Sequence, residues 1–299
     1  MGIDKRIMTY ALAFLDDRFT NPDEADILTV HALHYATAVF EGIRVYDGRA
    51  FKLAEHVERL LRSALVIGLQ PDIDAGRCAV VLEEMIMRSG LRNAYLRPVM
   101  FQGGVDLGVH APSNKTRFGA LIWDWPTVFG VSAMQKGIAL TTQVPYRRPP
   151  PSCFPTEAKS SAGYLTGAVN RRHAAEAGFD DALMLTHDGF VAEASGANIF
   201  AFHSGALLTP RPSGILDGIT RQTVMAHLPE GLTCRECDLD LSTLLEADEV
   251  FLTGTAYEIM PVRAIDGTRF QPGPQTRLIA DIYQTLTCAD YPSPAQSEK

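Results

Sequence analysis

The sequence lacks any hydrophobic segment long enough to cross a membrane. No apolar run reaches the ~18 residues that a spanning helix needs, and residues 1–6 do not lead into the apolar core of a secretion signal. An excess of basic residues is also missing, because the formal net charge is −8. An acidic chain is poorly suited to nucleic acid or to anionic lipid surfaces, so we expect neither as a partner.

Cysteines are few and irregularly spaced. The five are Cys78, Cys153, Cys234, Cys237 and Cys288. An odd, scattered set in a chain of this size is typical of reduced thiols, which indicates a cytoplasmic protein. Cys234 and Cys237 are the one close pair, and no second pair follows them, so we interpret their spacing as coincidence. His31 and His34 also lack a second ligand pair. We therefore predict no metal site and assign both rings to aromatic packing.

Internal repeats and nucleotide-binding motifs are absent as well. We find no Walker A motif and no GxGxxG after a strand. A chain of 299 residues with 46% hydrophobic content suits one large or two medium domains with a sizeable core. The composition shifts after residue 125, so we predict a small N-terminal domain at 1–125, a linker at 126–136 and a larger C-terminal domain at 137–299.

The hydrophobic pattern predicts both helices and strands along the whole chain. The spacing of the first helix places Arg59 beside its buried stripe and not within it. Helices are expected at 54–67, 75–89, 164–177, 220–228, 241–246 and 275–287. Strands are expected at 43–46, 51–53, 94–102, 118–125, 138–144, 182–186, 190–193, 199–202, 206–209 and 249–253. A strand or hairpin is expected at 3–14 with a turn at 16–17, and a disordered tail from 290.

One lysine stands in a distinctive setting. The chain has only six lysines, and Lys159 alone is followed by small residues, Ser-Ser-Ala-Gly, with Tyr164 five positions on. A lysine that forms a Schiff base needs open space around its amine and a lowered pKa. The local pattern also fits an ordinary exposed lysine at the start of a helix.

An acidic residue and two turns complete a chemical set. Glu193 ends a predicted strand beside Ala-Ser-Gly-Ala, and a carboxylate is what keeps a pyridine nitrogen protonated. The turns Gly218-Ile219-Thr220 and Gly254-Thr255-Ala256 offer backbone N–H groups to an anion, and Arg59 is a candidate charge clamp. Each feature also has an ordinary explanation. Glu193 could be a surface glutamate, the turn at Gly218 an ordinary helix N-cap, and Arg59 a solvated arginine. Together they point to a phosphorylated pyridine aldehyde, pyridoxal phosphate.

With these residues assembled, the chain resembles the fold-type IV pyridoxal-phosphate enzymes, and most of all the branched-chain amino acid aminotransferases. The similarity runs from about His31 to about Gly267. The matching segments are residues 31–46, 95–98, the Lys159 segment, 193–198, 218–221 and 253–256. This resemblance implies an α+β fold of two domains, with a small N-terminal α/β domain, a C-terminal domain built on a β-barrel-like core, and the active site between them.

The resemblance also implies roles for individual residues. Lys159 forms the Schiff base and shuttles the Cα proton, while Tyr164 and Glu193 contact the phenolic oxygen and the ring nitrogen. The other cofactor contacts are Arg59, Ile219, Thr220 and Thr255 at the phosphate, with Gly196 and Leu216 near the ring. The substrate side is formed by Tyr35, Phe40, Gly42, Tyr95, Arg97, Leu107, Val109 and Ala256. The loop at 104–109 comes from a second subunit, which implies a homodimer at least.

The activity implied is transfer of the amino group from a branched-chain L-amino acid to 2-oxoglutarate, in a ping-pong reaction through aldimine and ketimine forms. Arg97 and Tyr95 are expected to hold the distal carboxylate of the acceptor. Asp106 and Tyr257 depart from the branched-chain pattern, where a glycine and a small residue are usual. A D-amino acid or (R)-amine transaminase therefore stays open as an alternative, followed by an aminodeoxychorismate lyase and a non-catalytic carrier.

Overall fold

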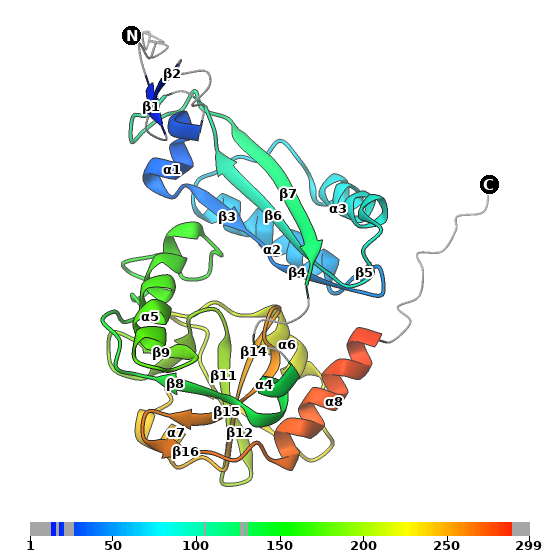
Figure 1. Ribbon diagram of the computed structural model, residues 1–299, viewed down its shortest axis with the longest axis vertical. Helices are drawn as coiled ribbons and strands as arrows, with labels where there is room; N and C mark the ends of the chain where they lie inside the picture. Colours follow the sequence, from blue (N-terminus) through cyan, green and yellow to red (C-terminus); the bar gives the residue numbers. More distant parts are fainter. Residues whose placement is uncertain are drawn as a thin grey trace, which may run out of the picture.

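The computed structural model describes residues 13–15, 18–20, 27–104, 106–125, 129 and 131–288. The described chain forms two units, each built on its own sheet, which lie one above the other in Figure 1. The short strands β1 (Ala13–Leu15) and β2 (Arg18–Thr20) pair antiparallel, as predicted for an N-terminal hairpin. Residues 3–12, the turn at 16–17 and the tail from 290 lie outside the described residues.

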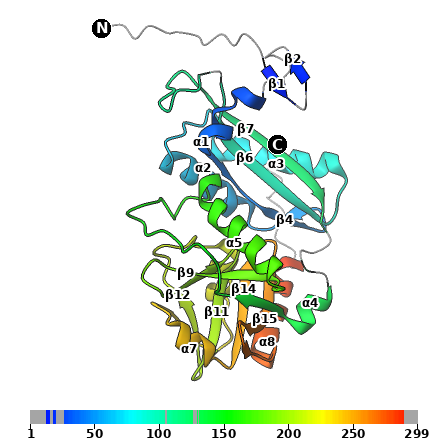
Figure 2. The same cartoon turned by 60° about the vertical axis from the view of Figure 1, so that its left-hand side comes forward.

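The N-terminal unit is a five-stranded sheet covered on one face by two helices. Its elements are α1 (His31–Tyr35), β3 (Ala38–Phe40), β4 (Ile43–Tyr46), β5 (Arg49–Ala50), α2 (Leu53–Val66), α3 (Ala75–Ser89), β6 (Ala94–Gln102) and β7 (Thr116–Asp124). The helices bury Leu60 and Leu82 against Leu96 of the sheet, with all three side chains fully enclosed. Figure 2 shows α2 and α3 behind the strands.

Two strands share one edge of β6. Strand β7 pairs with β6 along its full length, so β3 and β4 take the opposite edge, one after the other. They are separated by a corner at Glu41 and Gly42, beside Pro98, whose carbonyl accepts a hydrogen bond from the Glu41 N–H at 2.9 Å. A Cβ atom on Gly42 would collide with the phenol of Tyr95, so only glycine permits this close approach.

The strand predicted at 51–53 is wrong. The partner of β4 is β5, at Arg49–Ala50, joined by a turn in which Asp47 and Gly48 both have positive φ, 50° and 78°. Such turns match the twist of a hairpin. Phe51 and Lys52 form a turn, and α2 begins at Leu53, so the predicted strand is replaced by a turn and the first residue of the helix.

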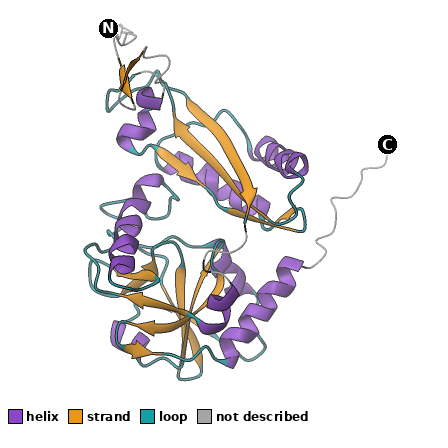
Figure 3. Cartoon of the chain, viewed as in Figure 1, coloured by secondary structure: helices purple, strands orange, loops and turns teal. Residues whose placement is uncertain are grey.

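The C-terminal unit is a nine-stranded sheet with the order β10-β9-β8-β15-β14-β11-β12-β13, and β16 beside β15. Its strands are β8 (Ile138–Thr141), β9 (Asp181–Leu185), β10 (Val191–Ala194), β11 (Asn198–His203), β12 (Ala206–Pro210), β13 (Cys234–Cys237), β14 (Glu249–Gly254), β15 (Glu258–Ile265) and β16 (Thr268–Arg269). The sheet curls into a half-barrel, as Figure 3 shows. The predicted α+β fold with a β-barrel-like core is confirmed.

Helices pack around this curled sheet. They are α4 (Val131–Lys136), η2 (Ser161–Gly163, a 3-10 turn), α5 (Tyr164–Glu176), α6 (Ile219–Ala226), α7 (Leu241–Leu245) and α8 (Pro274–Cys288). Val224 of α6 and Ile279 and Tyr283 of α8 bury one face against Phe200 and Phe251. No helix in the described ranges is both long and apolar enough to span a membrane.

Several elements were not predicted from the sequence. They are α1, β3, α4, β13, β15 and β16. Strand β15 is buried over Ile259–Val262 and contains Pro261, so it shows neither alternation nor a strand-like composition. Helix α4 lies inside the interval assigned to the linker, and its Met134 packs against the C-terminal core. The domain boundaries themselves stay a prediction.

Candidate active site

A cavity of about 360 Å³ is lined by residues of both units. Its volume lies in the range of small-molecule sites. Fourteen predicted site residues line it: Phe40, Gly42, Arg59, Tyr95, Arg97, Lys159, Tyr164, Glu193, Gly196, Leu216, Ile219, Thr220, Thr255 and Ala256. Tertiary folding thus collects segments that are up to 216 positions apart in the chain, from Phe40 to Ala256.

Lys159 and Tyr164 lie at the join between the two units. The Lys159 Nζ atom donates to the Tyr164 hydroxyl at 2.6 Å. The turn η2 between them brings the phenol back toward the amine, which a straight strand would not do. Phe40 packs edge-on against Tyr164, with ring centroids 4.8 Å apart, and the lysine amine lies 5.2 Å from the same Phe40 ring. The lysine and the phenol five positions after it are therefore in direct contact.

The backbone of Lys159 is held by the N-terminal unit. Its N–H donates to the Ser63 hydroxyl of α2 at 3.0 Å, and its carbonyl accepts from the Phe40 N–H at 3.1 Å. Ser160 continues this contact as an antiparallel bridge to Val39. Ser63 was missed from the sequence, because nothing in a helical serine indicates a partner 96 positions away.

Glu193 lies on β10 at a register shift between Val191 and Glu193. Such bulges redirect side chains. The carboxylate is buried, with Arg148 Nε 3.0 Å from Oε1 and the Asn198 amide donating to Oε2 at 3.2 Å. Burial raises the pKa of Glu193, and the Arg148 charge opposes that rise. Arg148 was not predicted as a site residue, since it lies 45 positions from Glu193. Asn198 was also not predicted, although it ends the segment 193–198 that contains the acid.

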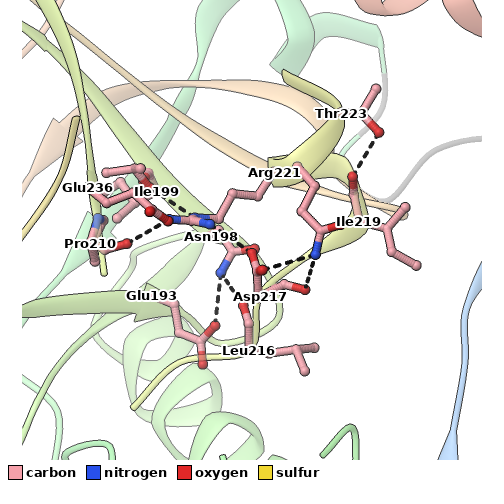
Figure 4. Close-up of polar contacts among 12 residues, drawn as sticks. Glu193, Asn198, Ile199, Pro210, Leu216, Asp217, Ile219, Arg221, Thr223 and Glu236 are labelled. Atoms are coloured by element: carbon pink, nitrogen blue, oxygen red, sulfur yellow. Dashed lines mark hydrogen bonds and ion pairs between the residues drawn. The ribbon is translucent and has the colours of Figure 1, made fainter. Parts of the chain in front are cut away.

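Asn198 joins two parts of the site. Its amide nitrogen donates to Glu193 and also to the Leu216 carbonyl, at 2.8 Å (Figure 4). Gly218 packs so closely on the Asn198 amide oxygen that a Cβ there would collide with it. The glycine in this turn is required by packing, and the acid at 193 is tied to the loop that leads into α6.

The turn before α6 presents backbone N–H groups that the helix itself does not use. Gly218 is extended, with φ −69° and ψ 139°, and the helix begins at Ile219, so its first N–H groups have no intrahelical partner. Beneath it the fully buried Arg221 donates to Asp217 Oδ1 at 2.7 Å and to the Pro210 carbonyl at 2.9 Å (Figure 4). Thr255 and Ala256 add a second turn after β14.

The sequence-based placement of Arg59 was wrong. Arg59 lies within the buried face of α2, 4% exposed. Its Nε and one terminal nitrogen donate to the two oxygens of Glu41, at 2.6 and 2.9 Å. The other terminal nitrogen donates to the Asp217 carbonyl at 3.3 Å. A helical stripe is normally apolar, and only a buried carboxylate from another element makes an arginine suitable there.

Three predicted substrate residues do not line the cavity of this chain. Tyr35, Leu107 and Val109 gather beyond it, where the Tyr35 hydroxyl donates to the Leu107 carbonyl at 2.8 Å and Val109 is 81% exposed. His31 packs its ring on Tyr35, with centroids 4.6 Å apart, in line with the predicted aromatic role. Its Nε2 also lies 3.0 Å from the Gly108 carbonyl, so it fixes this loop.

The two residues that depart from the branched-chain pattern have local partners. The Asp106 carboxylate accepts from the Gly108 N–H at 2.8 Å and does not line the cavity. The Tyr257 phenol is at the cavity wall and donates to the buried Asp181 at 2.6 Å. Across the described residues, no group of three or more His, Cys, Asp or Glu side chains is placed to hold a metal ion.

Comparison with known proteins identifies the family. The sequence profile described as Amino-transferase class IV matches residues 38–265, which is 228 of the 299 positions. This chain belongs to the class IV aminotransferases. The matched range contains the fourteen predicted site residues that line the cavity. The predicted family and enzyme class, a transaminase, are confirmed.

Individual relatives of this class IV aminotransferase match its sequence and its structure over most of their length. The branched-chain-amino-acid aminotransferase of Pseudomonas aeruginosa is 34% identical over 272 residues, 88% of each chain. A crystal structure of the T.th. branched-chain amino acid aminotransferase with pyridoxamine 5'-phosphate superposes with a TM-score of 0.83 and 34% identity, covering 90% of this chain and 92% of that one. The same enzyme complexed with N-(5'-phosphopyridoxyl)-L-glutamate superposes with a TM-score of 0.81 and 32% identity. That match covers 94% of this chain and 95% of the other.

Proposed function

We propose that this class IV aminotransferase moves the amino group of a branched-chain L-amino acid to 2-oxoglutarate, with pyridoxal phosphate as its cofactor. The observation that carries the proposal is the composition of one cavity. It brings together the Lys159–Tyr164 pair, the buried Glu193 and the anion-binding turn at Gly218–Thr220. The relatives that match over most of this chain are branched-chain aminotransferases.

The residues present fit the cofactor. The predicted cofactor is confirmed by the family and by the pyridoxamine 5'-phosphate held in the matching structure. When bound, pyridoxal phosphate supplies an electron-withdrawing ring that acidifies the Cα–H bond of an attached amino acid. Glu193 would keep the proton on the ring nitrogen, and Tyr164 would donate to the phenolic oxygen. The N–H groups of Ile219 and Thr220, with Arg59, would hold the phosphate.

The chain's own groups can move the proton. Lys159 Nζ is the one amine in the described lining of the cavity, so it would form the covalent bond to the cofactor and, once displaced by substrate, act as the base at Cα. The edge-on Phe40 ring narrows the space beside Nζ. Both half-reactions would use this same lysine in turn, as a ping-pong scheme requires.

Arg97 supports a dicarboxylate as the acceptor. Its guanidinium carbon lies 4.8 Å from the Phe40 ring centre and 5.4 Å from that of Tyr95. Within the described part of the chain its Nε has no hydrogen-bond partner. An arginine held between ring faces, with donors to spare, suits the distal carboxylate of 2-oxoglutarate, while the rings suit an aliphatic side chain. The Thr255–Ala256 turn would receive the α-carboxylate.

The alternatives gain no specific support. The Asp106 carboxylate accepts a hydrogen bond from the Gly108 N–H in its own loop, and the Tyr257 hydroxyl donates to Asp181. Neither places a free charged group in the cavity that would select an amine or a D-amino acid. L-amino acid transamination is therefore the reading that the lining residues favour.

We also propose a homodimer in the cytoplasm. Tyr35, at the end of α1, and Val109, in the loop after β6, are exposed, 42% and 81%, and neither lines the cavity of its own chain. This is consistent with residues 104–109 reaching the cavity of a second copy. All five cysteines are free, which suits a reducing compartment. Light scattering after gel filtration would give twice the chain mass, and a Val109→Asp variant would shift it toward the monomer.

A half-reaction screen tests the function. The purified protein would be mixed singly with L-leucine, L-glutamate, D-alanine and (R)-1-phenylethylamine while the cofactor's absorbance is followed. L-leucine and L-glutamate should change the spectrum, and a response to D-alanine alone would overturn the proposal. Borohydride reduction and peptide mapping should locate the cofactor on Lys159 in the wild type and in Lys136→Ala, and nowhere in Lys159→Ala.

A further inference from the structure

A buried acidic group lies outside the chemistry described so far. Glu41 occupies the corner between β3 and β4 and has no exposed surface. Arg59 donates to both of its oxygens, at 2.6 and 2.9 Å, and His56 Nδ1 lies 2.7 Å from Oε2. His56 and Arg59 are three positions apart on α2, so they share one face of the helix, and both are buried.

The pairing leaves Arg59 with donors for a ligand. A guanidinium has five N–H groups in a rigid plane. Glu41 takes the Nε proton and one from a terminal nitrogen, and the Asp217 carbonyl takes one from the other. The Arg59 side chain lines the cavity, so the remaining N–H groups are those available to an anion there. A two-point contact with Glu41 fixes both the plane and the rotation of the guanidinium.

We infer that Glu41 and His56 are positioning residues that hold the Arg59 guanidinium in the orientation that binds the cofactor's phosphate. This inference rests on the proposed function, in which Arg59 is a phosphate ligand. Glu41 acts from the N-terminal unit, whereas the turn at Gly218–Thr220 belongs to the C-terminal unit. Glu41 therefore sets the position of Arg59, which is the one proposed phosphate ligand that comes from the N-terminal unit.

His56 restrains the other side of the carboxylate. A carboxylate only accepts hydrogen bonds, so the proton between them resides on His56 Nδ1. Burial lowers the pKa of His56, although the Glu41 charge opposes this, so the ring stays a neutral donor. The Gly42 N–H also faces Glu41 Oε2, at 3.3 Å. Oε2 therefore faces donors from His56 and Gly42 as well as from Arg59, and these contacts oppose rotation of the carboxylate away from the guanidinium.

The experiment compares a ligand with and without the phosphate. Full-length protein freed of cofactor is titrated with pyridoxal 5'-phosphate and with pyridoxal, following imine absorbance. Wild type should prefer the phosphorylated form strongly. Glu41→Gln should weaken binding of pyridoxal 5'-phosphate by about tenfold or more and leave pyridoxal within about twofold. His56→Asn, which keeps a donor, should give a smaller loss. Glu55→Gln, on the same helix but paired with Lys52 at the surface, should match wild type.

The outcomes separate the inference from the function. A wild type without preference for the phosphate would defeat the proposed function. If wild type prefers pyridoxal 5'-phosphate and Glu41→Gln keeps that preference, the inference is overturned but the proposed function is not. The same holds if Glu41→Gln weakens binding of pyridoxal 5'-phosphate and of pyridoxal equally. If Glu41→Gln does not fold, Glu41→Asp replaces it, with the same expectation. In an Arg59→Met background the substitution of Glu41 should cause no further loss of phosphate preference, and an undiminished loss there would also overturn the inference.

Discussion

The Ser63 hydroxyl of α2 accepts a hydrogen bond from the backbone N–H of Lys159 at 3.0 Å, across 96 positions of sequence. Ser63 is 1% exposed, so water cannot replace it easily. Together with the Phe40 N–H on the Lys159 carbonyl, this contact fixes the main chain at the lysine from the N-terminal unit. Lys159 belongs to the C-terminal part of the chain, but its backbone is held by residues of the N-terminal unit.

Ser63→Ala should destabilise the fold through this contact. Removing the hydroxyl leaves the Lys159 N–H without its partner in a buried place, which costs about 1–3 kcal/mol. Urea unfolding would measure the loss. Ser242→Ala, at an exposed position of α7, is the matched control and should stay within about 0.5 kcal/mol of wild type. Equal stabilities for the two variants would show that the hydrogen bond contributes nothing.

Glu41→Gln should destabilise the protein in a pH-dependent way. Burial alone would raise the pKa of Glu41, but Arg59 and His56 outweigh it and hold the pKa far below the ordinary 4.5. A lowered carboxyl pKa contributes stability above the unfolded value, and that stability is lost as the pH falls. Breaking the buried pair should cost about 3–5 kcal/mol at neutral pH.

The sign of the pH effect can be checked by denaturant unfolding of wild type and of Glu41→Gln, each at about pH 5 and about pH 3.5. The stability difference should narrow at the lower pH, because the wild-type Glu41 starts to lose its advantage once the unfolded chain binds protons. A difference that stays constant or widens between these two conditions would contradict the assigned direction of the pKa.

Gly42→Ala should disturb the substrate side of the cavity. The added methyl would overlap the Tyr95 phenol, so either the ring or the corner has to move. We expect a loss of about 1–3 kcal/mol in stability and about a hundredfold in kcat/KM, since small misplacements are costly in catalysis. Gly119→Ala on β7 has open space around the new methyl and serves as the control. Combined with Tyr95→Ala, the Gly42→Ala penalty should shrink.

Arg97→Met should separate the two half-reactions. If Arg97 holds a distal carboxylate, the reaction with L-glutamate should weaken by about ten- to hundredfold through KM. The reaction with L-leucine, which has no such group, should change little. Arg97→Lys should fall between wild type and Arg97→Met, because an ammonium keeps the charge but not the planar fork. Equal losses for both amino acids would assign Arg97 a purely structural role.

Local sequence determined much of the fold and the chemical inventory. Periodicity located α2, α3 and β6 because each buries one regular face, and Asp47-Gly48 located a hairpin turn. The small residues after Lys159 and those around Glu193 marked positions where another group approaches closely. The cofactor followed from the kinds of groups present, since a lysine, a phenol, an acid and anion-binding turns have few other uses together.

Tertiary structure alone decided which of these groups meet and what supports them. Arg59 is buried because Glu41 arrives from another element, and no helical pattern can report that partner. Arg148 and Ser63 hold Glu193 and Lys159 through contacts that span 45 and 96 positions. Side chains and local turns are encoded over a few residues. The burial of a charge depends on a partner brought from far along the chain, so only the folded structure fixes it.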